Sequence, residues 1–149
     1  NTVVSRIIGE GRADEVHSAI LKILKNCLYC TIPIMILVSI FPLQMARIYT
    51  DDLNLAQLVI PSIYVICLGT IFQGIGNAYF EAVSGTGNTS AALYLETGIL
   101  VLYLAFVWGM THYTTRVELV WLAEILYGVL LGIFCGIYMK RANWNKKRI

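Results

Sequence analysis

Residues 53–80 read LNLAQLVIPSIYVICLGTIFQGIGNAYF, and this stretch contains no charged side chain. A helix needs about 20 mostly apolar residues to cross the roughly 30 Å hydrocarbon layer of a membrane. Because the run is continuously apolar rather than alternating, it favours a membrane-spanning helix over a barrel strand. It is longer than one crossing needs, so we expect either a tilted helix or a first turn at the interface.

Three other stretches have the same character, and the expected spans lie at about 24–46, 55–81, 91–110 and 119–139. The third contains only Glu96 as a charged residue, and the fourth contains only Glu124. Hydrophobic residues form 58% of the chain and charged residues 13%, against a charged share of about 25% in soluble domains. The sequence therefore predicts an all-α membrane protein, a polytopic bundle with four spanning helices.

The basic residues predict the orientation of these helices. If the spans alternate, one side receives nine of the eleven basic residues, namely Arg6, Arg12, Lys22, Lys25, Lys140, Arg141, Lys146, Lys147 and Arg148. The other side receives only Arg47 and Arg116. The positive-inside rule then places both ends of the chain in the cytoplasm, and we expect a multi-pass protein of the plasma (inner) membrane.

The tail at 140–149, KRANWNKKRI, fits this orientation, with Trp144 as an interfacial anchor. Its basic cluster is expected to lie beside anionic lipid headgroups. The net charge of +2 is therefore a topology signal, and no nucleic-acid partner is expected.

The start of the chain is abrupt, with no initiator Met and no signal peptide. Residues 1–8 have the character of the last turns of a membrane helix, and the polar turn Gly9–Arg12 and the amphipathic stretch Ala13–Lys25 follow. We therefore expect a piece of a larger protein, in which residues 1–8 end a preceding helix.

Motifs for enzymatic or metal chemistry are weak. Cys27 and Cys30 form a CxxC, but the pair lies in an apolar span without a second pair at zinc-site spacing. The remaining cysteines and both histidines have no partner nearby in the sequence, so we interpret the thiols as small apolar residues. We expect neither an enzyme nor a metal site, and no nucleotide-binding loop is present.

Three carboxylates lie in the expected spans or at their ends: Glu81, Glu96 and Glu124. A carboxylate at membrane depth usually faces the bundle interior or an aqueous cavity. Polar or small positions also recur at spacings of three and four before Glu81, at Thr70, Gln73 or Gly74, and Asn77. We expect these positions to share one helix face. Gln73 and Asn77 would line a cavity or a packed polar interface, and Glu81 would lie there or in the headgroup region.

Glu96 lies roughly one and a half turns into the third span, with Tyr103 two turns further on the same side. At this shallow depth Glu96 has three possible roles. It can line a cavity, extend toward the interface, or stabilise the positive end of the helix dipole.

Glu124 has aromatic residues three positions on either side, Trp121 and Tyr127. Three glycines, Gly128, Gly132 and Gly136, follow on nearly the same face, a spacing that lets membrane helices approach closely. Because lipid offers a carboxylate no partner, this face must pack against protein. Glu124 is then either a satisfied polar group in a packing seam or a protonation site.

Three motifs, in order along the chain, resemble the multidrug and toxic compound extrusion (MATE) family. Residues 83–89, VSGTGNT, resemble the xxRGxGxT turn of that family. Residues 4–12, VSRIIGEGR, resemble the polar turn that ends its eighth helix, and residues 46–52, ARIYTDD, the loop after its ninth. The resemblance covers nearly the whole chain, and it implies helices nine to twelve of twelve, the C-terminal part of the second lobe.

The resemblance implies a secondary active antiporter that exports organic, often cationic, compounds by alternating access between two six-helix lobes. The coupling ion would be Na⁺ or H⁺, with no other cofactor. The partners would be membrane lipids, the N-terminal lobe of the same protein and a small organic substrate.

Two positions depart from the family pattern. Some members carry a coupling carboxylate on the tenth helix, where this sequence has Gln73, and the usual Arg of the turn is Ser84. Glu96 or Glu124 would then be the substitute. Two alternatives stay open: a lipid-linked oligosaccharide flippase of similar plan, and a non-transporting membrane scaffold. The flippase predicts more cationic residues inside the spans, and the scaffold does not explain the turn motifs.

Overall fold

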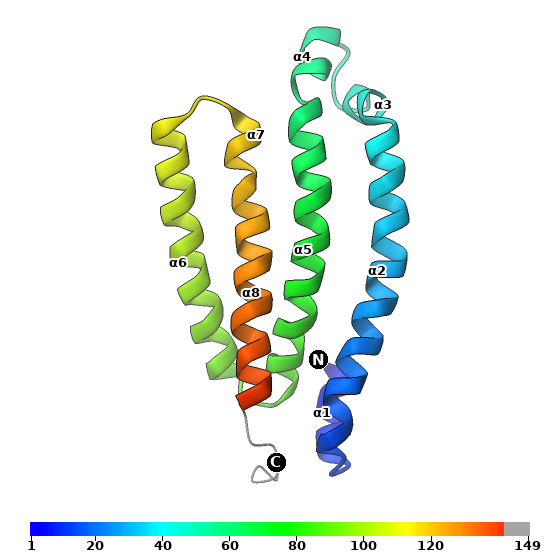
Figure 1. Ribbon diagram of the computed structural model, residues 1–149, viewed down its shortest axis with the longest axis vertical. Helices are drawn as coiled ribbons and strands as arrows, with labels where there is room; N and C mark the ends of the chain where they lie inside the picture. Colours follow the sequence, from blue (N-terminus) through cyan, green and yellow to red (C-terminus); the bar gives the residue numbers. More distant parts are fainter. Residues whose placement is uncertain (142–149) are drawn as a thin grey trace.

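The computed structural model describes residues 1–141, and the described part of the chain is helical with no strand (Figure 1). Its elements are α1 (Thr2–Gly9), the 3₁₀ turn η1 (Ala13–Glu15), α2 (Val16–Ile40), α3 (Pro42–Arg47), α4 (Leu53–Leu58), α5 (Ile60–Gly85), α6 (Thr89–Tyr113), α7 (Val117–Val120) and α8 (Leu122–Arg141). The expected tail beyond residue 141, with Trp144 and the basic residues at 146–148, lies outside the described residues.

Four stretches are long and apolar enough to cross a membrane: Val16–Ile40, Ile60–Gly85, Thr89–Tyr113 and Val117–Arg141. Their lengths of 25 to 26 residues correspond to roughly 38 Å at 1.5 Å per residue, more than the hydrocarbon layer requires. The predicted all-α fold with four candidate spanning helices is confirmed.

Two of the expected spans are divided. The first is broken at Phe41, because α2 ends at Ile40 and Pro42, which has no amide hydrogen, opens the short helix α3. The second is broken at Val59, between α4 and α5. Helix α4 is started by Asp52, whose side chain accepts hydrogen bonds from the amides of Asn54 and Leu55. The apolar run 53–80 thus contains a separate short first helix before the membrane helix.

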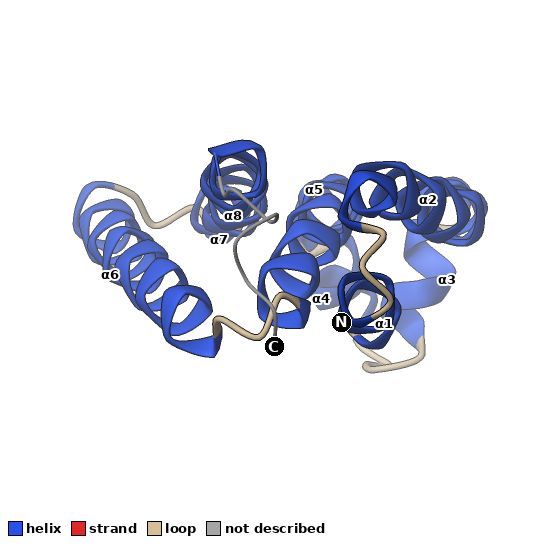
Figure 2. Cartoon of the chain, turned by 90° about the horizontal axis from the view of Figure 1, so that it is seen from below, coloured by secondary structure: helices blue, strands red, loops and turns tan. Residues whose placement is uncertain are grey.

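The four long helices lie in one row, in the order α6, α8, α5, α2 (Figure 2). The closest pair is α5 with α8, and α8 lies between α5 and α6. Helix α1 packs against α2 and α5, where the Ser5 hydroxyl donates to the carbonyl of Gly85 at 2.9 Å. Helix α1, the start of α6 and the end of α8 share one end of the bundle, and α3, α4 and α7 lie at the other.

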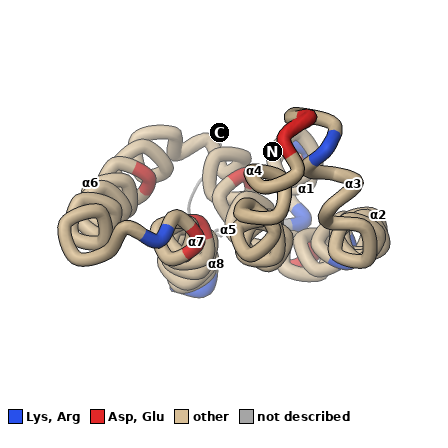
Figure 3. Tube along the Cα trace, turned by 90° about the horizontal axis from the view of Figure 1, so that it is seen from above, with Lys and Arg blue, Asp and Glu red and all other residues tan. Residues whose placement is uncertain are grey.

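The buried core lies at the α1 end. Its largest fully buried side chains include Ile20 of α2, Val83 of α5 and Leu131 of α8. Elsewhere the helices present large apolar side chains outward, as lipid-facing helices do; Leu104 is 61% exposed and Trp108 is 71% exposed. Charged positions along the helices are few (Figure 3). The four long helices thus form a single row with few buried side chains, and their apolar outer surface suits a lipid environment.

Candidate ion-coupling site

The carboxylate of Glu124 connects three of the four long helices. Glu124 lies in the first turn of α8 and is half-buried. The Gln73 amide of α5 donates to its Oε2 at 3.2 Å, and the Tyr103 hydroxyl of α6 donates to its Oε1 at 3.0 Å. Each carboxylate oxygen thus accepts a hydrogen bond from a different helix.

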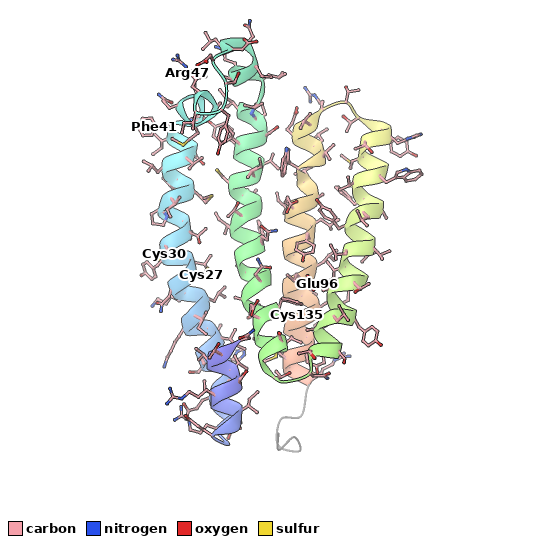
Figure 4. The ribbon with its side chains drawn as sticks, turned by 180° about the vertical axis from the view of Figure 1, so that it is seen from behind. Cys27, Cys30, Phe41, Arg47, Glu96 and Cys135 are labelled. Carbon is pink, nitrogen blue, oxygen red and sulfur yellow. The ribbon has the colours of Figure 1, made fainter. Side chains whose placement is uncertain are left out.

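Tyr127 lies one turn further along α8 and extends this cluster toward the middle of the bundle. Its ring meets that of Tyr103 edge to face, with centroids 5.9 Å apart and an interplanar angle of 76°. Glu96 of α6 lies nearer the α1 end of the same seam, beside the buried Cys135 of α8 (Figure 4). Glu96 and Glu124 therefore both lie along the seam between α6 and α8.

Glycine contacts hold α5 and α8 close enough for these bonds. A Cβ built on Gly128 would lie 2.5 Å from the backbone nitrogen of Gln73. A Cβ built on Gly76 would lie 2.5 Å from the carbonyl oxygen of Gly128. Gly69, one turn before Gln73, faces the Cβ of Glu124, which would be 3.2 Å away. The sequence reasoning did not identify Gly69 and Gly76, although their spacing of seven residues places them on one helix face.

The two later glycines of the predicted ladder differ from Gly128. A Cβ on Gly132 would have its nearest neighbour, the Cα of Gly76, 3.8 Å away. A Cβ on Gly136 would have its nearest neighbour, the Tyr79 ring, 4.0 Å away. Both are ordinary van der Waals distances. Only Gly128 of the three is therefore at a position where the helix approach requires a glycine.

The expected polar face of α5 is divided between two sides of the helix. Gly74, Asn77 and Glu81 line a cavity of about 560 Å³ between α1, α2 and α5, which Cys27 also lines. Gln73 points instead to Glu124 on α8. Of the two alternatives for the polar face, Gln73 or Gly74, it is Gly74 that lines the cavity with Asn77 and Glu81. Thr70 lines a separate apolar cavity, and its hydroxyl donates to the carbonyl of Ile66.

Glu81 is about half exposed at the end of α5, and its Oε2 lies 3.5 Å from the nitrogen of Asn1. Glu81 is therefore more exposed than Glu124 and shares none of its hydrogen-bond partners. Among residues 1–141, no group of three or more His, Cys, Asp or Glu side chains could hold a metal ion. The ion pairs found in that range involve other carboxylates than Glu96 and Glu124.

The partners of Glu124 can hydrogen-bond a carboxyl group whether it is ionised or neutral. An amide and a phenol both donate and accept hydrogen bonds. They can donate to an ionised carboxylate, and after an amide flip or a hydroxyl rotation they can accept the proton of a neutral one. Glu124 therefore has partners in both of its charge states.

The family model for MatE matches residues 1–108. That range includes α5 and most of α6, and with them Gln73, Glu96 and Tyr103. No curated protein matches the chain, and no solved structure does. The match covers most of the chain, in agreement with the four candidate spanning helices and the turn motifs. The chain therefore belongs to the MatE family of membrane transporters.

Proposed function

We propose that the protein exports small organic, often cationic, compounds in exchange for H⁺ or Na⁺, and that Glu124 is the ion-coupling group. The observation that supports this most is the placement of Glu124, a half-buried carboxylate inside a candidate span, bonded to Gln73 and Tyr103. Intramembrane carboxylates with partners of this kind are a frequent feature of ion pathways.

Ion uptake at Glu124 would alter the contacts between three helices. The ionised carboxylate accepts one bond from α5 and one from α6. Neutralising it removes a charge from a low-dielectric setting and weakens both bonds, since hydrogen bonds to charged groups are roughly twice as strong as neutral ones. A change of that size biases an equilibrium between two arrangements of the helices, which is what alternating access requires.

The partners of Glu124 favour H⁺ over Na⁺ as the coupling ion. Both of its hydrogen-bond partners present donors to the carboxylate, whereas a sodium site presents converging oxygen atoms. Among residues 1–141, Glu124 accepts hydrogen bonds from Gln73 and Tyr103 and is bonded to no second carboxylate. A proton needs only the one carboxylate and partners that satisfy both charge states.

The cavity beside Glu81 supports the export of organic cations. Its volume of about 560 Å³ is within the roughly 300–1,000 Å³ of small-molecule sites. Its lining is mainly apolar, with Asn77 and Glu81 as the polar groups of α5. An apolar wall with one carboxylate suits an amphipathic cation.

The test is efflux of a fluorescent cation from cells expressing the full-length natural protein, with the Na⁺ and H⁺ gradients collapsed separately. We expect efflux to stop when the H⁺ gradient is collapsed. Efflux that stops only with the Na⁺ gradient would assign Na⁺ as the coupling ion. With the protein shown to be in the membrane, no efflux under any condition would contradict antiport and favour a lipid-linked oligosaccharide flippase or a scaffold.

A further inference from the structure

A groove on another side of the α5–α8 pair is separate from the Glu124 cluster and from the Glu81 cavity. It has a volume of about 470 Å³ and lies between the start of α2, α5 and α8. Phe72 and Ile75 of α5 form one wall, and Ile133 and Ile137 of α8 form the other. Its lining contains no Asp or Glu among the described residues, and the proposed function uses none of these side chains.

The glycines of α8 make this groove deep at one end and closed at the other. Gly132 and Gly136 line it, and at both a Cβ would find no atom closer than 3.8 Å. A Cβ at either position would make ordinary van der Waals contact with α5, and the missing side chains of both glycines leave room in the groove. At Gly128 the backbone of α5 comes within 2.5 Å of an added Cβ, so the groove ends at this contact.

The length of the groove matches one leaflet of a membrane. Gly128 and Lys140 both line it, and they are twelve positions apart on α8, about 18 Å along the axis. Half of a hydrocarbon layer of roughly 30 Å is about 15 Å. The groove therefore extends from headgroup level, at Lys140, to near the bilayer midplane, at Gly128.

Basic residues stand at the headgroup end. Lys140 lines the groove there with the imidazole of His17, and both side chains are exposed. Arg141 follows Lys140 and is exposed as well. At this level an exposed ammonium group attracts the phosphate of an anionic lipid, and the long side chain can extend to reach it.

We propose that this groove binds one anionic phospholipid, with an acyl chain along Gly132 and Gly136 and the phosphate at Lys140 and His17. A free anion would leave the apolar length of the groove empty. A lipid fills both parts, because its phosphate meets Lys140 at the mouth and its chain lies against the apolar walls and the glycines. The site is independent of the ion-coupling role of Glu124.

The experiment is native mass spectrometry of the full-length protein, purified and mixed with defined lipids. We expect phosphatidylglycerol to bind more tightly than phosphatidylcholine. Lys140→Gln should lose about fivefold in affinity for phosphatidylglycerol, the effect of one basic residue near the membrane surface. Lys22→Gln is the matched control, because Lys22 is an exposed lysine of the same membrane side that does not line the groove.

Filling the groove tests its apolar part. Gly136→Leu should abolish binding of the lipid in the groove, because the new side chain occupies the place of the acyl chain. Gly98→Leu is the control, since Gly98 of α6 is exposed and has no atom within 4 Å of an added Cβ. Size-exclusion chromatography of each variant checks that it is folded and shows its mass.

Three outcomes would overturn the proposal. Equal binding of the two lipids would remove the role of the cations. Unchanged binding in both Lys140→Gln and Gly136→Leu would place any bound lipid elsewhere. No bound lipid, together with a lower oligomeric mass for Gly136→Leu, would show that a helix of a second copy fills the groove.

Discussion

Gly76 of α5 and Gly128 of α8 meet backbone to backbone: a Cβ on Gly76 would lie 2.5 Å from the carbonyl oxygen of Gly128. This contact fixes the register of the two helices. In that register Gln73, one turn before Gly76, reaches Glu124, one turn before Gly128. The glycine contact and the Gln73–Glu124 hydrogen bond therefore depend on the same helix register. A substitution at either glycine should alter the hydrogen bonding of Glu124.

Replacing Gly128 by Ala should destabilise the bundle, because its Cβ would clash with the backbone of Gln73 and force α5 and α8 apart. Overpacking of this kind costs about 1–3 kcal/mol. Gly132→Ala is the control and should cost nothing, since a methyl group fits there. Thermal unfolding of the purified full-length protein would compare the two. Equal melting temperatures for both variants would contradict the close contact.

Tyr103→Phe should slow ion-coupled efflux about tenfold or more while leaving the protein folded. The change removes one hydrogen bond to the Glu124 carboxylate and keeps the ring that meets Tyr127. Bonds to charged groups contribute about 1.5–3 kcal/mol. Tyr94→Phe is the matched control, because Tyr94 lies on the same helix and is 78% exposed. Initial efflux rates at equal expression are the measurement, and equal rates would argue against a role for this bond.

Tyr138→Phe should weaken the attachment of α6 to α8 at the α1 end. The Asn88 side-chain amide donates to the Tyr138 hydroxyl at 2.8 Å, and the Asn88 oxygen accepts from the amide of Ala91. The Phe variant removes the first bond and keeps the helix cap. We expect a loss of about 1 kcal/mol, and a larger loss for Asn88→Ala, which removes both. Thermal unfolding of the two variants would show whether that order holds.

The corner between α1 and α2 should respond to acid. The Arg6 guanidinium, 2.8 Å from Glu10, lowers the pKa of that carboxyl below its usual range, and Arg12 contributes at 3.3 Å. A lowered folded-state pKa means that the ion pairs contribute fully above the ordinary pKa of a Glu, about 4.3. That contribution is lost as the pH falls through the folded-state value.

A spin label at Asp14 should therefore gain mobility as the pH falls below about 4. In Glu10→Gln the gain in mobility should be smaller, because both Glu10 pairs are absent and only the Arg12–Glu15 pair remains. The pairs are exposed, so added salt should reduce the difference. A label whose mobility follows pH equally in both proteins would exclude Glu10 as the cause.

The four membrane-spanning helices could be predicted from the sequence because a helix in lipid requires a long, mostly apolar run. The residues at which these helices begin and end could not. The break at Phe41 and the separate helix α4 depend on Pro42 and on the cap at Asp52, and both signals lie inside or beside the same apolar run.

The partners of Glu124 could not be predicted in the same way. The sequence placed Glu124 on a packing face with Gly128, but it did not indicate which residue of α5 would meet it. That choice depends on the register of two helices, which Gly76 and Gly128 set through a backbone contact. A single sequence shows the small residues that permit such a contact, but it does not show which glycine of one helix meets which glycine of the other.

The most direct measurement is substrate-driven proton movement in proteoliposomes that contain the full-length protein and a pH-sensitive dye. With wild-type protein, adding an organic cation on one side should drive protons in the opposite direction. Glu124→Gln should abolish this signal, and Glu118→Gln, a change at an α7 carboxylate paired with Arg116, should retain it. Proton movement that persists undiminished in Glu124→Gln would contradict the assignment of Glu124 as the coupling group.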